Sequence, residues 1–154
     1  ARIPRPGSQG VAKAAFSTDG SHLTYLKSGD GSLTTQLYAT DVATGTTKLA
    51  FGSETSEDSF TLSKEEQMRR ERARVMATGV TTYQWAKNAD VLLVPADGAL
   101  FVKQGIEGAA KKLFDVDAFP DVGRGPPLDA KLSEDGKRVV FVWADEVTCS
   151  VSLV

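Results

Sequence analysis

Arginine side chains gather in one short segment of the sequence and could bind an anion or a carbonyl group. Four arginines occur within residues 69–74. A guanidinium group carries paired N–H donors whose geometry matches carbonyl and carboxylate oxygens. We therefore treat Arg70, Arg72 and Arg74 as candidate binding residues. The alternative is that these arginines cover the solvated face of a helix, since charged residues commonly occupy such faces.

Cysteine and histidine offer little further chemistry, because Cys149 is the one thiol and His22 the one imidazole in the sequence. One cysteine cannot form an internal disulfide, and one cysteine with one histidine is too few for a structural zinc site. Nor are the two residues spaced to build a Cys–His catalytic pair. Cys149 alternates with Val147 and Val151 and is predicted to be a buried strand residue. His22 is predicted to lie in a solvated polar turn. A Gly-x-Ser-x-Gly nucleophile elbow is also missing, so the sequence predicts no catalytic residue, no metal and no cofactor for this chain.

The arginines are expected to lie on a helix within an insertion over residues 53–79. Ser63 can cap this helix by accepting from the backbone amide of Glu66, whose side chain can reach back to the amide of Ser63. Gly79 suits the C-terminal cap. Acidic residues in the first half and arginines in the second complement the helix dipole. Because the apolar stripe is thin, most of the helix is predicted to stay hydrated or to line a polar cavity.

Three stretches of the chain repeat one pattern around this insertion. In each, a short apolar strand ends in a large residue, a polar turn follows, and a second, more hydrophobic strand comes next. The large residues are Phe16, Trp85 and Leu132. Asp-Gly and Asn-Ala in the turns tolerate the positive φ of tight hairpins. The first two copies continue into four antiparallel strands, whereas the third stops during its third strand. The copies occupy residues 11–51, 80–114 and 128–154.

The repeat predicts an all-β fold, a partial β-propeller of about two and three-quarter four-stranded blades with the arginine-rich helix inserted between the first two. Trp85 and Leu132 are 47 residues apart, and propeller blades repeat about every 45 residues. A β-sandwich built from the same hairpins is the alternative, but the identical order of turns favours the propeller. Open sheet edges and an unfinished core predict that residues 1–154 belong to something larger and are marginally stable or aggregation-prone alone.

Composition excludes several other classes of protein. The formal charge is −2, and 41% of the residues are apolar, so a dedicated nucleic-acid binder or a disordered acidic tail is not expected. Apolar runs reach about five residues, against roughly 20 for a membrane span. The first residues carry no signal-peptide core, so the compartment stays unknown. One unpaired cysteine and no Asn-x-Ser/Thr site favour a cytoplasmic or bacterial periplasmic protein.

Residues 62–74, followed closely by residues 79–85, resemble a known family. Their sequence matches the pattern Leu-Ser-x-Glu-Glu-x-x-x-Arg-Glu-Arg-x-Arg ahead of a strand that ends in Tyr-x-Trp. This pattern is similar to that in the N-terminal propeller of the dipeptidyl peptidase IV family, a group of prolyl oligopeptidase-type serine peptidases. The other repeats agree with that family only generically, through Phe-Ser-x-Asp-Gly and Leu-Ser-x-Asp-Gly.

The resemblance implies an eight-bladed propeller packed on an α/β-hydrolase domain that is absent from this chain. The parent would be a homodimer that releases Xaa-Pro or Xaa-Ala dipeptides from peptide N-termini by a serine nucleophile with His and Asp. An arginine of the propeller would bind the substrate's backbone carbonyl. By motif position that arginine is Arg70, Arg72 or Arg74, with Arg70 the first choice. This piece would gate and position the peptide N-terminus without being catalytic alone.

Three alternatives remain open at this point. Glu65 and Glu66 could imitate the paired glutamates that hold the substrate's amino group in this family, but the helix cap already explains Glu66. The chain could instead belong to a non-catalytic propeller that serves as a protein-interaction scaffold, with the arginine helix as its docking surface. An acylaminoacyl peptidase or oligopeptidase relative would share the layout but should lack that helix.

Overall fold

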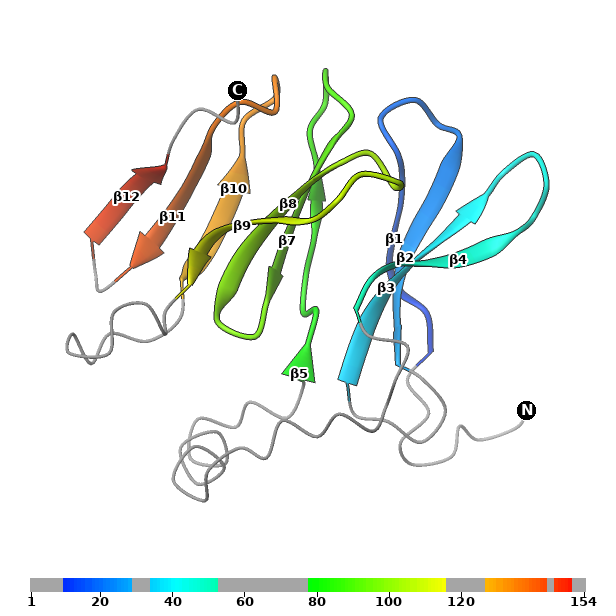
Figure 1. Cartoon of the computed structure of the whole chain (residues 1–154), viewed down its shortest axis with the longest axis horizontal. Helices are drawn as coiled ribbons and strands as arrows, with labels where there is room; N and C mark the ends of the chain where they lie inside the picture. Colours follow the sequence, from blue (N-terminus) through cyan, green and yellow to red (C-terminus); the bar gives the residue numbers. More distant parts are fainter. Residues whose placement is uncertain (1–9, 29–33, 53–77, 116–126, 144–145, 151–154) are drawn as a thin grey trace.

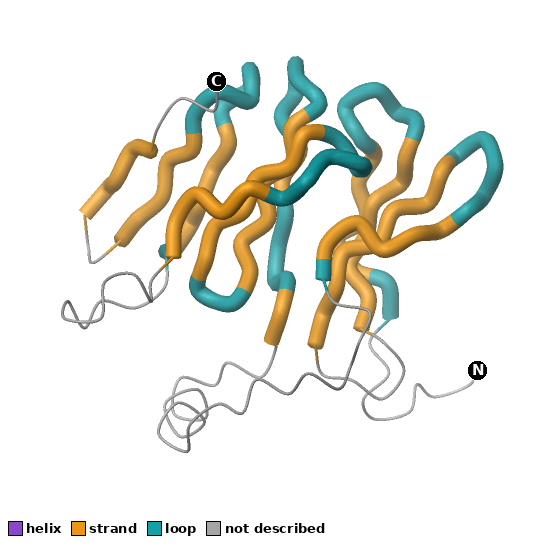
Figure 2. Tube along the Cα trace, viewed as in Figure 1, coloured by secondary structure: helices purple, strands orange, loops and turns teal. Residues whose placement is uncertain are grey.

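The computed structural model describes residues 10–28, 34–52, 78–115, 127–143 and 146–150. Strands and turns, with no helix, make up these ranges (Figure 2), so the all-β prediction is confirmed for them. No described segment forms a helix that is long and apolar enough to cross a membrane. The predicted arginine-rich helix lies outside the described residues, apart from its expected end at residues 78–79.

Sheet 1 is an antiparallel meander with one short parallel addition. Its four main strands follow each other in the order β1-β2-β3-β4. They are β1 (Ala12–Phe16), β2 (His22–Ser28), β3 (Thr34–Asp41) and β4 (Thr47–Phe51). The short strand β5 (Thr78–Gly79) pairs in parallel with the start of β3.

Sheets 2 and 3 repeat this meander. Sheet 2 contains β6 (Gln84–Trp85), β7 (Val91–Ala96), β8 (Ala99–Gln104) and β9 (Lys111–Asp115). Sheet 3 contains β10 (Leu128–Leu132), β11 (Val139–Trp143) and β12 (Glu146–Ser150). The predicted first strand of sheet 2 is shorter than expected, because Val80 makes only an isolated bridge with Ala96 before β6 begins. β7 and β8 join through Asp97 and Gly98, both with positive φ, as a two-residue hairpin requires.

The three sheets share the same strand register. In each sheet the last residue of the first strand lies opposite a hydrophobic residue just after the turn. These pairs are Phe16 with Leu23, Trp85 with Leu92, and Leu132 with Val139. Sheets 1 and 2 also share a β-bulge, beside which Leu37 lies opposite Phe51 and Leu100 lies opposite Phe114. The registers therefore define equivalent positions in different sheets.

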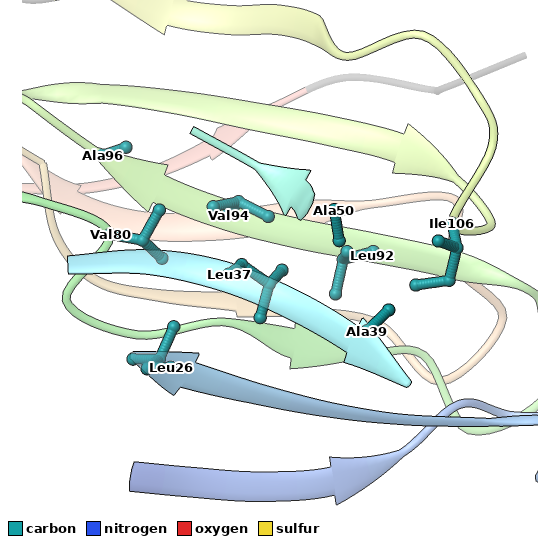
Figure 3. Packing of buried hydrophobic residues seen from close by; sticks show 9 residues of the cluster. All are labelled: Leu26, Leu37, Ala39, Ala50, Val80, Leu92, Val94, Ala96 and Ile106. Carbon is teal, nitrogen blue, oxygen red and sulfur yellow. The ribbon is translucent and has the colours of Figure 1, made fainter. Parts of the chain in front are cut away.

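The sheets lie side by side in chain order (Figure 1), so each has a forward face toward the next sheet and a rear face toward the previous one. The forward face of sheet 1 packs on the rear face of sheet 2, and both faces are apolar (Figure 3). The first contributes Leu26, Leu37, Ala39 and Ala50; the second contributes Trp85, Leu92, Val94 and Phe101. Phe51 and Phe101 meet across this interface with ring centroids 5.0 Å apart.

A second apolar interface joins sheet 2 to sheet 3. The forward face of sheet 2 supplies Leu93, Leu100, Val102 and Phe114, and the rear face of sheet 3 supplies Leu132, Val139 and Phe141. Phe114 and Phe141 pack with centroids 5.0 Å apart, so an aromatic pair bridges this interface as well. Burial of these faces, rather than strand pairing between sheets, holds the three meanders together.

Two sequence predictions need correction. Gly79, expected to cap a helix, lies in β5, where its φ is +84° and a Cβ would approach the carbonyl oxygen of Thr35 to 2.4 Å. Glycine suits both roles because both require positive φ, so the sequence could not separate them. His22, expected in a solvated loop, begins β2 and is half-buried. Cys149 does lie in a strand, β12, opposite Val140, whereas its burial lies outside the described residues.

Candidate functional site

The predicted binding residues Arg70, Arg72 and Arg74 lie outside the described residues, as do Glu65 and Glu66. Both ends of their segment are described. The chain leaves sheet 1 at Gly52, directly after β4, and returns at Thr78, which pairs with Thr34 at the start of β3. The arginine segment is therefore tied at both ends to the same sheet.

Asp97 fixes the point where this segment returns. Its carboxylate accepts a hydrogen bond from the backbone amide of Gly79 at 3.0 Å, and the amide of Val80 donates to the carbonyl of Thr35 at 2.8 Å. Asp97 belongs to the β7–β8 hairpin of sheet 2. The return strand is thus held by sheet 1 on one side and sheet 2 on the other.

A polar seam of Thr24, Tyr83 and Trp85 crosses the interface between sheets 1 and 2. The indole N–H of Trp85 donates to the hydroxyl of Thr24 at 3.0 Å. The Tyr83 hydroxyl lies within hydrogen-bond distance of the Thr24 carbonyl, at 2.8 Å, and of the Lys13 carbonyl. Burial raises the pKa of Tyr83, and its hydrogen bond with Thr24 opposes that rise. The seam has no free donor to offer a ligand, so its role is to fix how the two sheets meet.

Sequence reasoning missed this seam, although one signal was present. Thr24 lies opposite Ala15 in sheet 1, and the equivalent positions in the other sheets hold Leu93 and Val140. A hydroxyl-bearing residue where two repeats place an aliphatic one indicates a local polar partner. Thr24 is fully buried, so its hydroxyl needs that partner.

The substitution Thr24→Val is expected to lower the free energy of unfolding by about 1–3 kcal/mol, because it leaves the N–H of the half-buried Trp85 without its acceptor. Valine fits the backbone, since Val140 occupies the equivalent position. Urea unfolding followed by tryptophan fluorescence measures the loss. Thr46→Val, at an exposed position just before β4, is the matched control and should change stability by no more than about 0.5 kcal/mol. Equal losses in both variants would contradict the role of the seam.

Lys103 is the second feature that the sequence did not reveal. Its side chain is buried, and its Nζ donates to the carbonyl of Ala50 in sheet 1 at 2.6 Å and to that of Ile106, in the β8–β9 turn, at 2.8 Å. Burial lowers the pKa of Lys103, and the nearby charge of Lys48 lowers it further. Lys48 itself forms an ion pair with Glu107 across the same interface. Lys103 therefore ties two sheets together through backbone oxygens, and no carboxylate among the described residues pairs with it.

Asp19, Ser21 and His22 bring a carboxylate, a hydroxyl and an imidazole together in the first turn. The Ser21 hydroxyl donates to Asp19 at 2.7 Å and lies 2.7 Å from the Nδ1 of His22. In a Ser-His-Asp triad the imidazole stands between the other two groups, whereas here the serine does. Hydrogen bonds from Ser17 and Ser21 lower the pKa of Asp19 to about 2, which makes it a weak base. This arrangement cannot activate a serine nucleophile and instead closes the turn.

The third turn repeats the serine–aspartate part of this arrangement. Ser133 donates to Asp135 at 2.5 Å, and Asp135 accepts from the backbone amide of Lys137. Those bonds lower the pKa of Asp135 as well. The Ser-x-Asp-Gly sequence is thus a turn-forming motif in this chain. Among the described residues, His, Cys, Asp and Glu side chains form no group of three that could hold a metal ion.

The turns also contact one another along one rim of the sheets. The Thr18 hydroxyl lies 2.7 Å from the carbonyl of Ala86, and the amide of Asn88 donates to the carbonyl of Glu134. Lys87 and Glu134 form an ion pair. Each turn therefore holds the next, which supports the face-to-face order of the three sheets.

No protein-family model fits the sequence, and no curated protein is significantly similar to it. The resemblance to the dipeptidyl peptidase IV family therefore depends on residues 62–74 and 79–85. Those residues begin in the segment that sheet 1 anchors and end at the first strand of sheet 2.

Proposed function

We propose that the three sheets are neighbouring blades of a β-propeller. The shared register of Phe16, Trp85 and Leu132 supports this, since propeller blades are repeats of one meander. The regular forward-on-rear packing supports it further. A β-sandwich would bury one inner face per sheet, whereas sheet 2 buries both faces.

We propose further that this propeller belongs to a dipeptidyl peptidase IV-like serine exopeptidase, which releases Xaa-Pro or Xaa-Ala dipeptides from peptide N-termini. The observation that carries the proposal is the sequence of residues 62–74, which matches the arginine-rich motif of that family throughout. In this function the chain positions the substrate, and an α/β-hydrolase domain of the same parent supplies nucleophile, base and oxyanion hole.

The arginines give the chain its part in the reaction. A guanidinium group that donates to a backbone carbonyl of the peptide fixes the distance between the substrate's N-terminal end and the nucleophile. Arg70 is the first candidate, followed by Arg72 and Arg74. Anchoring of their segment by β5 and Asp97 suits this role, because a positioning residue needs a rigid attachment.

Arginine substitutions in the parent protein test the proposal. Arg70→Ala, Arg72→Ala and Arg74→Ala are assayed singly with a chromogenic Gly-Pro substrate. For the arginine that contacts the carbonyl, kcat/KM is expected to fall by about 10- to 100-fold, the loss of one charged hydrogen bond. Arg138→Ala, an exposed arginine in the third turn, is the control and should leave kcat/KM unchanged.

Two outcomes would overturn the peptidase proposal. One is a parent protein with no activity on Gly-Pro or Gly-Ala substrates. The other is unchanged kcat/KM in all three arginine variants. A folded, inert protein that binds another protein through this segment would instead favour the interaction-scaffold function.

A further inference from the structure

Strand β5 and the residue after it form a clasp between sheets 1 and 2. The clasp consists of Thr78, Gly79 and Val80, and it lies where the arginine segment rejoins the sheets (Figure 1). Gly79 pairs with Thr35 of β3, and Val80 forms a bridge with Ala96 of β7. Val80 is only 1% exposed and packs in the core that the two sheets share (Figure 3). The clasp therefore belongs to both sheets at once.

Asp97 supplies a side-chain hydrogen bond to this clasp. Its carboxylate accepts from the backbone amide of Gly79 at 3.0 Å. The backbone of Asp97 has a φ of +47°, which the two-residue hairpin between β7 and β8 requires. Glycine would supply that φ without strain. The turn alone therefore does not require a carboxylate oxygen here, whereas the bond to Gly79 does.

Gly79 is fixed from both sides. A Cβ at this position would approach the carbonyl oxygen of Thr35 to 2.4 Å and the Cγ2 of Thr34 to 2.9 Å. Sheet 1 thus contacts one side of Gly79 closely, and the Asp97 carboxylate of sheet 2 holds its amide. Removing the Asp97 carboxylate frees one of these two constraints while the other stays in place.

The clasp is the nearer of the two attachment points of the arginine segment. Arg74 lies five residues before Gly79, and Arg70 lies nine residues before it. Gly52, where the chain leaves sheet 1, lies 18 residues before Arg70. Five residues of chain span at most about 18 Å. A displacement of the clasp is therefore passed to the arginines more directly than a displacement at Gly52.

We propose that Asp97 is a positioning residue for the substrate-binding arginines, because it holds the amide at the point from which their segment extends. This inference rests on the proposed peptidase function, since it assigns Asp97 a role at the same site. Asp97 acts through the clasp and does not itself contact the substrate. Loss of its carboxylate shifts the guanidinium groups relative to the peptide carbonyl, and a misplacement of about 1 Å can lower the rate by about 100-fold.

Two substitutions of Asp97 in the parent protein test this role with a chromogenic Gly-Pro substrate. Asp97→Gly keeps the positive φ but removes the hydrogen bond, so kcat/KM is expected to fall by about tenfold. Asp97→Asn keeps an acceptor oxygen and tolerates positive φ, so it should retain most of the activity. Asp129→Gly is the matched control, because Asp129 is also exposed and has a φ of +48° but lies in β10 of sheet 3. Its kcat/KM should not change.

A double-mutant cycle separates positioning from a general loss of structure. Asp97→Gly is combined with the arginine-to-alanine substitution that lowers kcat/KM most when it is made singly. If Asp97 acts through that arginine, the double variant should be no less active than the arginine variant alone. Losses that multiply in the double variant would overturn the proposal.

Amide hydrogen exchange tests the clasp without any measurement of activity. Asp97→Gly should speed the exchange of the Gly79 and Val80 amides by at least about tenfold, whereas Asp97→Asn and Asp129→Gly should leave it unchanged. Unchanged exchange in Asp97→Gly overturns the proposal whatever the substrate assays give. If exchange accelerates and an arginine variant loses activity while Asp97→Gly does not, the positioning role fails and the peptidase function stands. If exchange accelerates but the parent cleaves no Gly-Pro substrate, both proposals fail.

Discussion

Phe141→Ala is expected to lower the free energy of unfolding by about 3–5 kcal/mol, the usual cost of truncating a buried phenylalanine. Phe141 is only 2% exposed and lies on the rear face of sheet 3 against Phe114. Its removal opens a cavity at the interface between sheets 2 and 3. Because sheet 3 contacts the rest of the described chain mainly through this interface, part of the loss should appear as early detachment of sheet 3.

Phe16→Ala is the matched control for this prediction. Phe16 ends the first strand of its sheet but is 61% exposed, so its truncation should change stability by no more than about 0.5 kcal/mol. Urea unfolding measures the stability of both variants. Hydrogen exchange of β11 amides shows whether sheet 3 opens first. If Phe141→Ala lowered the free energy of unfolding as little as Phe16→Ala, by no more than about 0.5 kcal/mol, the burial of Phe141 at this interface would be contradicted.

The strands and turns could be predicted from the sequence because their signals are local. Gly20 and Gly136, which follow Asp19 and Asp135, have the positive φ that these tight turns require, and alternating apolar residues flank the turns. The same sequence pattern, a polar turn and then a hydrophobic strand after Phe16, Trp85 and Leu132, is enough to predict the three repeats. Regular signals of this kind specify a meander but not what lies against its faces.

The inter-sheet contacts could not be predicted because they join residues far apart in the chain. Thr24 and Trp85 are 61 positions apart, and Lys103 reaches Ala50 over 53 positions. Alternation within β8 (Ala99–Gln104) places Lys103 on the rear face of sheet 2. No neighbouring residue in the sequence indicates that two backbone carbonyl oxygens accept hydrogen bonds from it there. The sequence predicts Gly79 as a helix cap although it lies in β5, because glycine with positive φ suits a helix end and this strand alike. The arginine-based substrate site stays a prediction.

Lys103 is the most informative polar residue of the core, because it is buried with two backbone carbonyls and no carboxylate among the described residues as its partners. An ammonium group loses hydration when it is buried, and here the Ala50 and Ile106 carbonyls offset that loss. A neutral amine still has two N–H donors, enough for both carbonyls. Deprotonation therefore removes the cost of the buried charge while the two hydrogen bonds can remain.

Lys103→Met is expected to lower the free energy of unfolding by about 2 kcal/mol at pH 7, because two buried carbonyls lose a donor while a buried charge is removed. The difference from the unmodified chain should grow as the pH rises. Since the pKa of Lys103 is lowered from 10.5 in the folded state, the unfolded chain binds more protons between the folded and unfolded pKa values. Stability conferred by Lys103 therefore increases through that window up to about pH 10.5.

Urea unfolding of both proteins at intervals from pH 7 to pH 10.5 measures this dependence. Lys111→Met, at an exposed position of β9, is the control and should stay within about 0.5 kcal/mol of the unmodified chain at each pH. A difference that shrinks with rising pH would mean that Lys103 is stabilised as a cation in the folded state. That result would contradict the burial of Lys103 between the two sheets, because such a trend requires a folded-state pKa above 10.5, as in a lysine paired with a carboxylate.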